Sequence, residues 1–236
     1  ATVQQPDSKE LPAAVTQPAL VGRSASVNQP VAVIQPEAMN QPAPSKRGIV
    51  LELGVVFLLC ADFLAIAALQ MAGTFGTVYM QQIGGAGAMI GAVMGISALG
   101  EVPGMLFGSR ISRRLGDTTA IIIGFVLISI GMAGYAATRS PWMVLAFSAL
   151  RGLGFGQLLV STIMIINTRA PHGYAATYQG ILNAACWGLA PLLGGPAGGW
   201  IYQNLGASTL FLTAAGLNLV SVALITPTYR LWKKSK

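Results

Sequence analysis

Six long apolar runs occupy most of this sequence and constrain its fold more than any other feature. Each run reaches the roughly 20 residues that a helix needs to cross the hydrocarbon core of a membrane at 1.5 Å per residue. Membrane-spanning strands alternate polar and apolar residues and these runs do not, so the runs predict helices. They cover about 49–80, 86–109, 118–138, 141–167, 174–202 and 207–229. We therefore expect an all-α polytopic membrane protein with six transmembrane helices.

The composition agrees with a membrane protein. Of the 236 residues, 53% are hydrophobic and only 9% are charged, whereas a soluble domain carries about 25% charged residues. The net charge of +7 comes from basic residues that lie between the apolar runs. Because they do not gather on one soluble face, they argue against nucleic-acid binding. Cys60 and Cys186 lie inside apolar runs and predict no disulfide framework.

Residues 1–48 differ from the rest of the chain, because Gln-Pro pairs recur there and large apolar groups are few. The segment shows neither the apolar period of a helix nor that of a strand, and its composition predicts a disordered cytoplasmic linker. The six-helix transmembrane region would then cover 49–232. The sequence opens without an initiating Met and without a signal sequence, so we expect it to be part of a longer protein.

Basic residues predict which side of the membrane each connection occupies. The connections after the second and fourth runs are basic, whereas that after the third carries Arg139 alone. Cytoplasmic connections carry an excess of Lys and Arg. We therefore expect an integral protein of the plasma (inner) membrane with both ends cytoplasmic. The basic residues on the expected cytoplasmic side are Lys46, Arg47, Arg110, Arg113, Arg114, Arg169, Arg230, Lys233, Lys234 and Lys236.

Two ionisable residues lie deep inside apolar runs at similar expected depths. Glu101 is about nine residues, or roughly 13 Å, from the end of its run at Arg110. Arg151 is about ten residues, or roughly 15 Å, from the opposite end of its run near Pro141. An unpaired charge in hydrocarbon is heavily penalised, so we expect these two to pair. The pair is either a static contact that fixes packing or a site that binds and releases a proton, and we favour the second interpretation.

Other polar residues inside the runs are candidates for substrate binding. Asp62 in the first run is a second candidate for proton or ligand binding, or else an acid capped by nearby hydroxyl groups. Asn183 and Trp187 are four residues apart and would share a helix face, where an amide beside an aromatic ring suits a sugar or a planar metabolite. Gln157 and Tyr178 could line the same cavity or make hydrogen bonds between helices. Glycines at 152, 154 and 156, and at 194, 195, 198 and 199, predict close helix packing.

Motifs of soluble enzymes are missing from the sequence. The single histidine, His172, has no second His or Cys at metal-ligand spacing, and no phosphate-binding Gly-Lys-Ser loop or Gly-x-Ser-x-Gly elbow occurs. We therefore expect no enzyme activity, no metal and no cofactor.

The segment after the second run resembles the loop signature of the major facilitator superfamily, in which a glycine precedes an acid, two basic residues and a glycine. Ser112 stands where the acid is expected. The order Glu101-Val102-Pro103, then Arg151-Gly152-Leu153-Gly154, is similar to the branch that contains lactose permease and nucleoside–proton symporters. The residues assigned to the cytoplasmic loop signature are Gly108, Arg110, Arg113, Arg114, Gly116 and Asp117.

The resemblance implies the C-terminal half of a 12-helix transporter, with two inverted three-helix repeats at about 49–138 and 141–230. A missing N-terminal six-helix half would precede the linker and complete the site. Glu101 would then couple protons to substrate movement, with Arg151 as its partner. We expect secondary transport of a small polar metabolite, such as a sugar or a nucleoside, by alternating access. The alternatives are a drug or metabolite exporter, or a membrane sensor or assembly module that transports nothing.

Overall fold

The structure, a computed structural model, describes residues 53–171 and 173–234, with side chains described up to Thr228. The predicted linker and His172 therefore lie outside the described residues. The described part is helical and contains no strand, which confirms an all-α polytopic membrane protein. In chain order the elements are α1 (Leu53–Gln82), α2 (Gly87–Leu115), α3 (Asp117–Ala137), α4 (Pro141–Arg169), α5 (Ala175–Asn183), the π-helix η2 (Ala184–Leu189), α6 (Ala190–Leu205) and α7 (Ala207–Lys234).

Five of these helices are long and apolar enough to cross a membrane: α1, α2, α3, α4 and the part of α7 from Ala207 to Thr228. The remaining predicted run forms one continuous helical segment, 175–205, that consists of α5, η2 and α6. Pro191 explains the interruption. It has no N–H to donate to the carbonyl of Trp187, and immediately before it the N–H of Ala190 bonds to the carbonyl of Ala185, five residues back.

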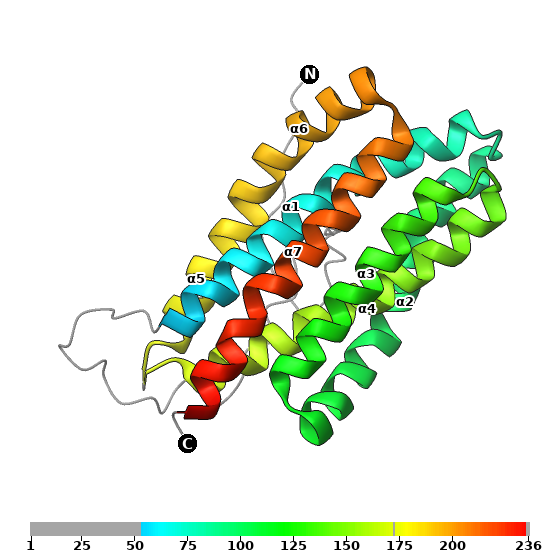
Figure 1. Cartoon of the computed structure of the whole chain (residues 1–236). Coiled ribbons are helices and arrows are strands. Elements are labelled where there is room, and N and C mark those ends of the chain that lie inside the picture. The colour runs from blue at the N-terminus through cyan, green and yellow to red at the C-terminus, as the bar shows by residue number, and fades with distance from the viewer. Residues whose placement is uncertain (1–52, 172, 235–236) are drawn as a thin grey trace, which may run out of the picture. The chain divides into compact units, whose positions relative to one another are not determined.

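The helices pack mainly between the two expected three-helix repeats rather than within them (Figure 1). α4 packs most extensively on α2 and α3, while α1 packs on α7 and α6 and α3 also packs on α7. These contacts have an internal symmetry. The same pairs of helices remain in extensive contact when α1 is exchanged with α4, α2 with the α5–η2–α6 segment, and α3 with α7. Because two helical segments lie between the members of each exchanged pair along the chain, the partners run in opposite directions. Inverted repeats have this relationship.

Glycine allows the backbones of α2 and α4 to touch. A side-chain methyl group on Gly152 would overlap the carbonyl oxygen of Ser97, and one on Gly156 would overlap that of Glu101. Small residues permit this close approach between membrane helices. Gly194 of α6 lies similarly against Ala67 of α1, so both predicted glycine-rich faces are packing faces. Gly195 is an exception, because nothing lies within 4 Å of the position that its side chain would occupy.

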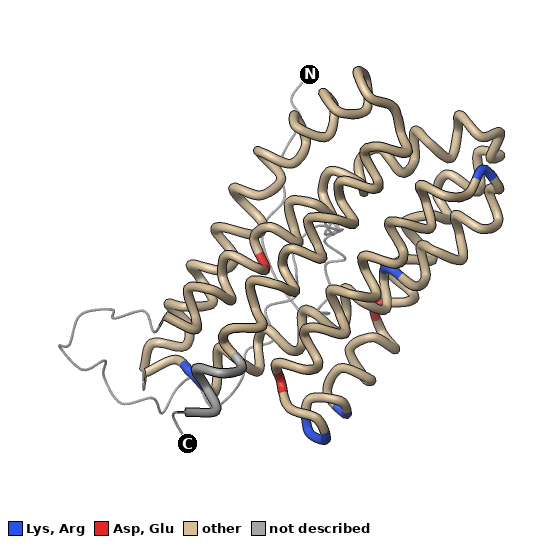
Figure 2. Tube along the Cα trace, in the orientation of Figure 1, with Lys and Arg blue, Asp and Glu red and all other residues tan. Residues whose placement is uncertain are grey.

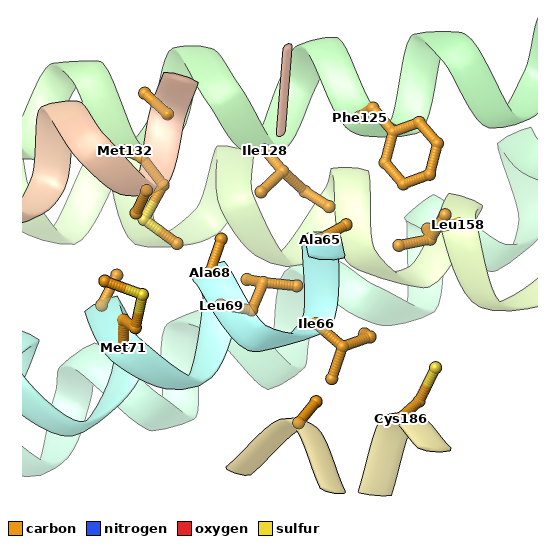
Figure 3. Packing of buried hydrophobic residues seen from close by; sticks show 14 of the residues in the cluster. Ala65, Ile66, Ala68, Leu69, Met71, Phe125, Ile128, Met132, Leu158 and Cys186 are labelled. Atoms are coloured by element: carbon orange, nitrogen blue, oxygen red, sulfur yellow. The ribbon is translucent and has the colours of Figure 1, made fainter. Parts of the chain in front are cut away.

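Buried side chains fill the space between α1, α3, α4 and η2 (Figure 3). Figure 3 labels Ala65, Ile66, Ala68, Leu69, Met71, Phe125, Ile128, Met132, Leu158 and Cys186. Buried hydroxyl groups also connect neighbouring helices. Ser129 of α3 donates to the carbonyl of Ala215 in α7 at 2.8 Å, and Ser221 of α7 donates to that of Ala61 in α1 at 2.9 Å.

The segment predicted as a cytoplasmic loop signature is largely helical, which corrects the sequence interpretation. Arg113 and Arg114 form the last turn of α2, where basic side chains stabilise the negative end of the helix dipole. Gly116 alone separates α2 from α3, with φ at +89°, a conformation that favours glycine. Ser112, which replaces the expected acid, donates a hydrogen bond to Asp117 at the start of α3. Gly108 is buried against Gln157, and Arg110 is exposed on α2.

Candidate functional site

A cavity of about 440 Å³ lies among α1, α2, α4 and η2. Its lining combines apolar and aromatic side chains with a few polar ones, which is typical of small-molecule sites. Glu101, Arg151 and Trp187, which the sequence predicted separately, come together here. The lining residues are Ile66, Leu69, Gln70, Gly73, Thr74, Met94, Ser97, Glu101, Arg151, Phe155 and Trp187.

Glu101 contributes the carboxylate of the cavity. It is the central residue of α2 and lies one helical turn after Ser97, so both side chains reach the cavity from the same face. Its backbone carbonyl lies against Gly156, which holds this turn of α2 tightly against α4. The Glu101 side chain is half-buried. The carboxylate is therefore attached to a closely packed helix pair and reaches an open space.

Arg151 contributes the guanidinium. The residue is 8% exposed, and its Nε atom is buried without a hydrogen-bond partner. The side chain extends from α4 toward α1, because a side-chain carbon on Gly73 would lie 3.7 Å from Nη1 of Arg151. The guanidinium thus spans the cavity between two helices.

Glu101 and Arg151 line one cavity but form no ion pair, although both lie in the described part of the chain. The two residues therefore meet in one site and interact electrostatically, but they form no direct ion pair. The reason lies in the packing of α2 on α4. Gly152 and Gly156 make the backbone contact, and Arg151 projects beside that contact toward α1.

Two aromatic residues form an apolar wall of the cavity. The rings of Phe155 and Trp187 lie edge to face, with centroids 6.1 Å apart and an interplanar angle of 76°. Phe155 follows Arg151 by one turn of α4, and Trp187 belongs to the π-helical turn η2. Trp187 is 51% exposed, so it has surface available for a ligand. Single π-helical turns occur frequently at functional sites.

Three predicted binding residues lie away from this cavity. Asn183 ends α5 and is exposed, and it does not line the cavity although Trp187, four residues later, does. Gln157 is buried, and its Nε2 atom donates to the carbonyl of Ala120 in α3 at 2.7 Å, so it connects two helices. Tyr178 is also buried and does not line the cavity.

Asp62 lies just beyond the cavity, on the same face of α1. It is one turn before Ile66, which lines the cavity. Its Oδ2 atom accepts a hydrogen bond of 2.7 Å from Thr162 of α4, as the hydroxyl-capped interpretation expected. Its Oδ1 atom is buried and has no hydrogen-bond partner. Figure 2 shows acidic positions inside the bundle, one of them close to a basic position, and further basic positions at both ends of the bundle.

Sequence reasoning missed four polar or aromatic lining residues: Gln70, Thr74, Ser97 and Phe155. Gln70 and Thr74 are four residues apart on α1, and Ser97 and Phe155 are each four residues from a charged residue of the site. A spacing of four residues places side chains on one face of a helix, and this pattern could have identified these residues from the sequence. Among the described residues, no group of three or more His, Cys, Asp or Glu could hold a metal ion.

Comparison with known proteins supports an assignment to a transporter family. The MFS_1 like family matches residues 19–213. The chain is 26% identical over 189 residues to the multidrug resistance protein MdtH of Yersinia enterocolitica, and 28% identical over 190 residues to MdtH of Yersinia pestis and of Yersinia pseudotuberculosis. Each match covers 76% of this chain and 45% of the relative.

The chain thus spans slightly under half the length of these relatives. Their names refer to multidrug resistance and not to sugars or nucleosides. The family match covers well over half of the chain and agrees with the helical architecture. The chain therefore belongs to the MFS_1 like family, within the major facilitator superfamily of membrane transport proteins.

Proposed function

We propose that this chain forms half of a secondary transporter that exports small amphipathic organic molecules, with the cavity around Glu101 as part of the binding site. The observation that carries the proposal is the presence of a carboxylate and two aromatic rings in one cavity of about 440 Å³. A cavity of this size suits a drug-sized molecule. The multidrug resistance proteins among its relatives support the same substrate class.

The lining favours an amphipathic substrate over a sugar or a nucleoside. Ile66, Leu69, Met94, Phe155 and Trp187 give the cavity a large apolar surface. The amides that sequence reasoning assigned to substrate recognition are elsewhere, because Gln157 connects two helices and Asn183 lies outside the cavity. A sugar needs several hydrogen-bonding groups around it, and this half of the site offers few.

We further propose that Glu101 couples export to proton movement. A carboxylate inside the membrane is costly unless it is paired or functional. Glu101 has no ion-pair partner in the described part of the chain, and its position in the cavity lets it meet both a substrate and a proton. Protonation would remove the negative charge from the site and change its affinity for a charged substrate.

The transport cycle requires more than this chain. Alternating access in this superfamily uses two six-helix halves that rock around a central site, and this chain spans 45% of the length of its relatives. We propose that the missing half covers the cavity from the other side. The basic ends of α2 and α4 would lie in the cytoplasm of a cell whose plasma (inner) membrane holds the protein.

Transport by the full-length protein tests this proposal. The protein is expressed in a bacterial strain that lacks its main efflux pumps, and inside-out membrane vesicles are prepared. A pH gradient is imposed, and accumulation of anionic, neutral and cationic amphipathic dyes is followed. We expect the wild type and Glu101→Asp to accumulate at least one dye, and Glu101→Gln to lose the dependence on the gradient. Unchanged gradient-driven accumulation by Glu101→Gln would exclude Glu101 as the coupling residue.

A further inference from the structure

We propose that Arg151 binds an anionic group of the transported molecule, so that the cavity selects aromatic organic anions. This inference rests on the proposed transport function and names the chemical class of its substrate. The structural basis is a guanidinium in the cavity whose buried Nε atom has no hydrogen-bond partner, next to a wall of aromatic rings.

The state of Arg151 indicates a missing anionic partner. Only 8% of the residue is exposed, and its Nε atom lacks a hydrogen-bond acceptor. An arginine stays charged at any physiological pH, so it cannot avoid the cost of burial by losing a proton. Within a membrane this cost is offset by an anion or by several acceptors. In the described part of the chain the Nε atom has no acceptor, and Glu101 interacts with the guanidinium electrostatically without forming an ion pair.

Among the residues that the structure describes, only one other charged side chain lines the cavity. α1 contributes the neutral polar residues Gln70 and Thr74, η2 contributes Trp187, and α2 contributes Glu101. Asp62, on the cavity-facing side of α1, lies one turn beyond the lining and is already bonded to Thr162. Glu101 is therefore the one carboxylate of the lining that could compete with a ligand for Arg151.

The position of Arg151 suits an anion that is attached to an aromatic ring. Phe155 lies one turn further along α4, on the same face as Arg151, and its ring meets that of Trp187 edge to face. An aryl carboxylate can therefore place its ring on this wall while its two oxygens accept from the guanidinium. Planar, bidentate recognition of a carboxylate is the geometry for which arginine is best suited.

A matched set of probes tests the proposal with purified full-length protein in lipid nanodiscs. Naphthoate, naphthamide and naphthylmethylammonium share one ring system and are anionic, neutral and cationic. Affinities are measured by calorimetry for the wild type, Arg151→Gln, Arg151→Lys and Glu101→Gln. Arg139→Gln is the matched control, because Arg139 is exposed in the connection between α3 and α4.

We expect the wild type and Arg139→Gln to bind naphthoate at least about tenfold more tightly than naphthamide, as a charge-assisted hydrogen-bonded pair should provide. Arg151→Gln should bring the two affinities within about twofold of each other, and Arg151→Lys should retain part of the preference. Glu101→Gln should keep the preference for naphthoate, because the guanidinium of Arg151 is still present.

Other outcomes separate the anion site from the transport function. Equal binding of naphthoate and naphthamide by the wild type, or no saturable binding of naphthoate, would overturn the anion site even if dye export still required Glu101. A preference for naphthoate that disappears in Arg151→Gln would support the anion site even if the vesicles exported no dye. If Arg151→Gln fails to fold, the Arg151→Lys variant decides the question. Bidentate recognition predicts that Arg151→Lys keeps only part of the preference for naphthoate over naphthamide. Full retention or complete loss of that preference would contradict it.

Discussion

The hydroxyl group of Thr162 donates a hydrogen bond of 2.7 Å to Oδ2 of Asp62, and this contact joins α4 to α1. Both residues are buried, and Asp62 lies one turn before the α1 residues that line the cavity. The second carboxylate oxygen, Oδ1, has no hydrogen-bond partner. Among the described residues, Thr162 is therefore the one hydrogen-bond donor to this buried acid.

Thr162→Val should destabilise the protein, because it keeps the shape of the side chain and leaves the Asp62 carboxyl group without its donor. Loss of a partner from a buried polar group costs about 1–3 kcal/mol. Thermal unfolding of the purified full-length protein, followed by a thiol-reactive dye or by intrinsic fluorescence, measures the change.

Thr168→Val is the matched control for that measurement. Thr168 lies on the same helix and is exposed, and its hydroxyl donates only to carbonyl groups of its own helix. Replacement of Thr168 should change the midpoint temperature of thermal unfolding little. Equal shifts for the two variants would contradict a specific role of the Thr162–Asp62 contact.

Gly152→Ala should destabilise the packing of α2 on α4, because the added methyl group overlaps the carbonyl oxygen of Ser97. Overpacking of a close contact costs about 1–3 kcal/mol. Gly95→Ala is the control, since nothing lies within 4 Å of its side-chain position. That variant should be neutral or stabilised by about 0.5–1 kcal/mol, the helix preference of alanine over glycine. Unfolding midpoints in one detergent compare the two, and the opposite ranking would refute this packing.

Gln157→Leu should lower stability without changing ligand affinity. The Gln157 side chain donates to the carbonyl of Ala120 at 2.7 Å and lies outside the cavity. Loss of this hydrogen bond costs about 1 kcal/mol. Gln179→Leu, which removes a more exposed hydrogen bond to Asn167, should cost less. Weaker naphthoate binding by Gln157→Leu, in a protein of nearly normal stability, would show that Gln157 reaches the ligand after all.

Trp187→Ala should weaken naphthoate binding by about tenfold, because the ring contact and its buried area are lost. Asn183→Ala should keep the affinity within about twofold of the wild type, since Asn183 does not line the cavity. Calorimetry on the same nanodisc samples measures both. A comparable loss in both variants would indicate that α5 and η2 present one continuous face to the ligand.

Several features of the site could be predicted from the sequence. Glu101 and Arg151 were expected at one depth because helical rise converts residue number into distance along an axis, and the structure places both in one cavity. The close packing of Gly152 and Gly156 was expected because glycines at a spacing of four leave a groove on a helix. Both inferences depend on a regular α-helix.

Inferences failed where the helix departs from that regularity or where a second helix decides the outcome. Trp187 lines the cavity and Asn183 does not, although the two are only four residues apart. Arg113 and Arg114 were expected in a loop, but α2 continues through them to Leu115. Depth alone did not reveal that Arg151 extends toward Gly73 rather than to Glu101.

The sequence by itself determined that the chain crosses a membrane as helices, because runs of apolar residues leave the backbone no partner in lipid except its own. It also determined which charges lie inside those helices. Only the tertiary structure decided which of the charged residues share a cavity, and that Asp62 bonds to Thr162 while the Nε atom of Arg151 has no hydrogen-bond partner. The physical reason is that a helix sets the direction of a side chain relative to its own axis. What the side chain meets depends on how closely neighbouring helices approach, and here glycine contacts set that approach.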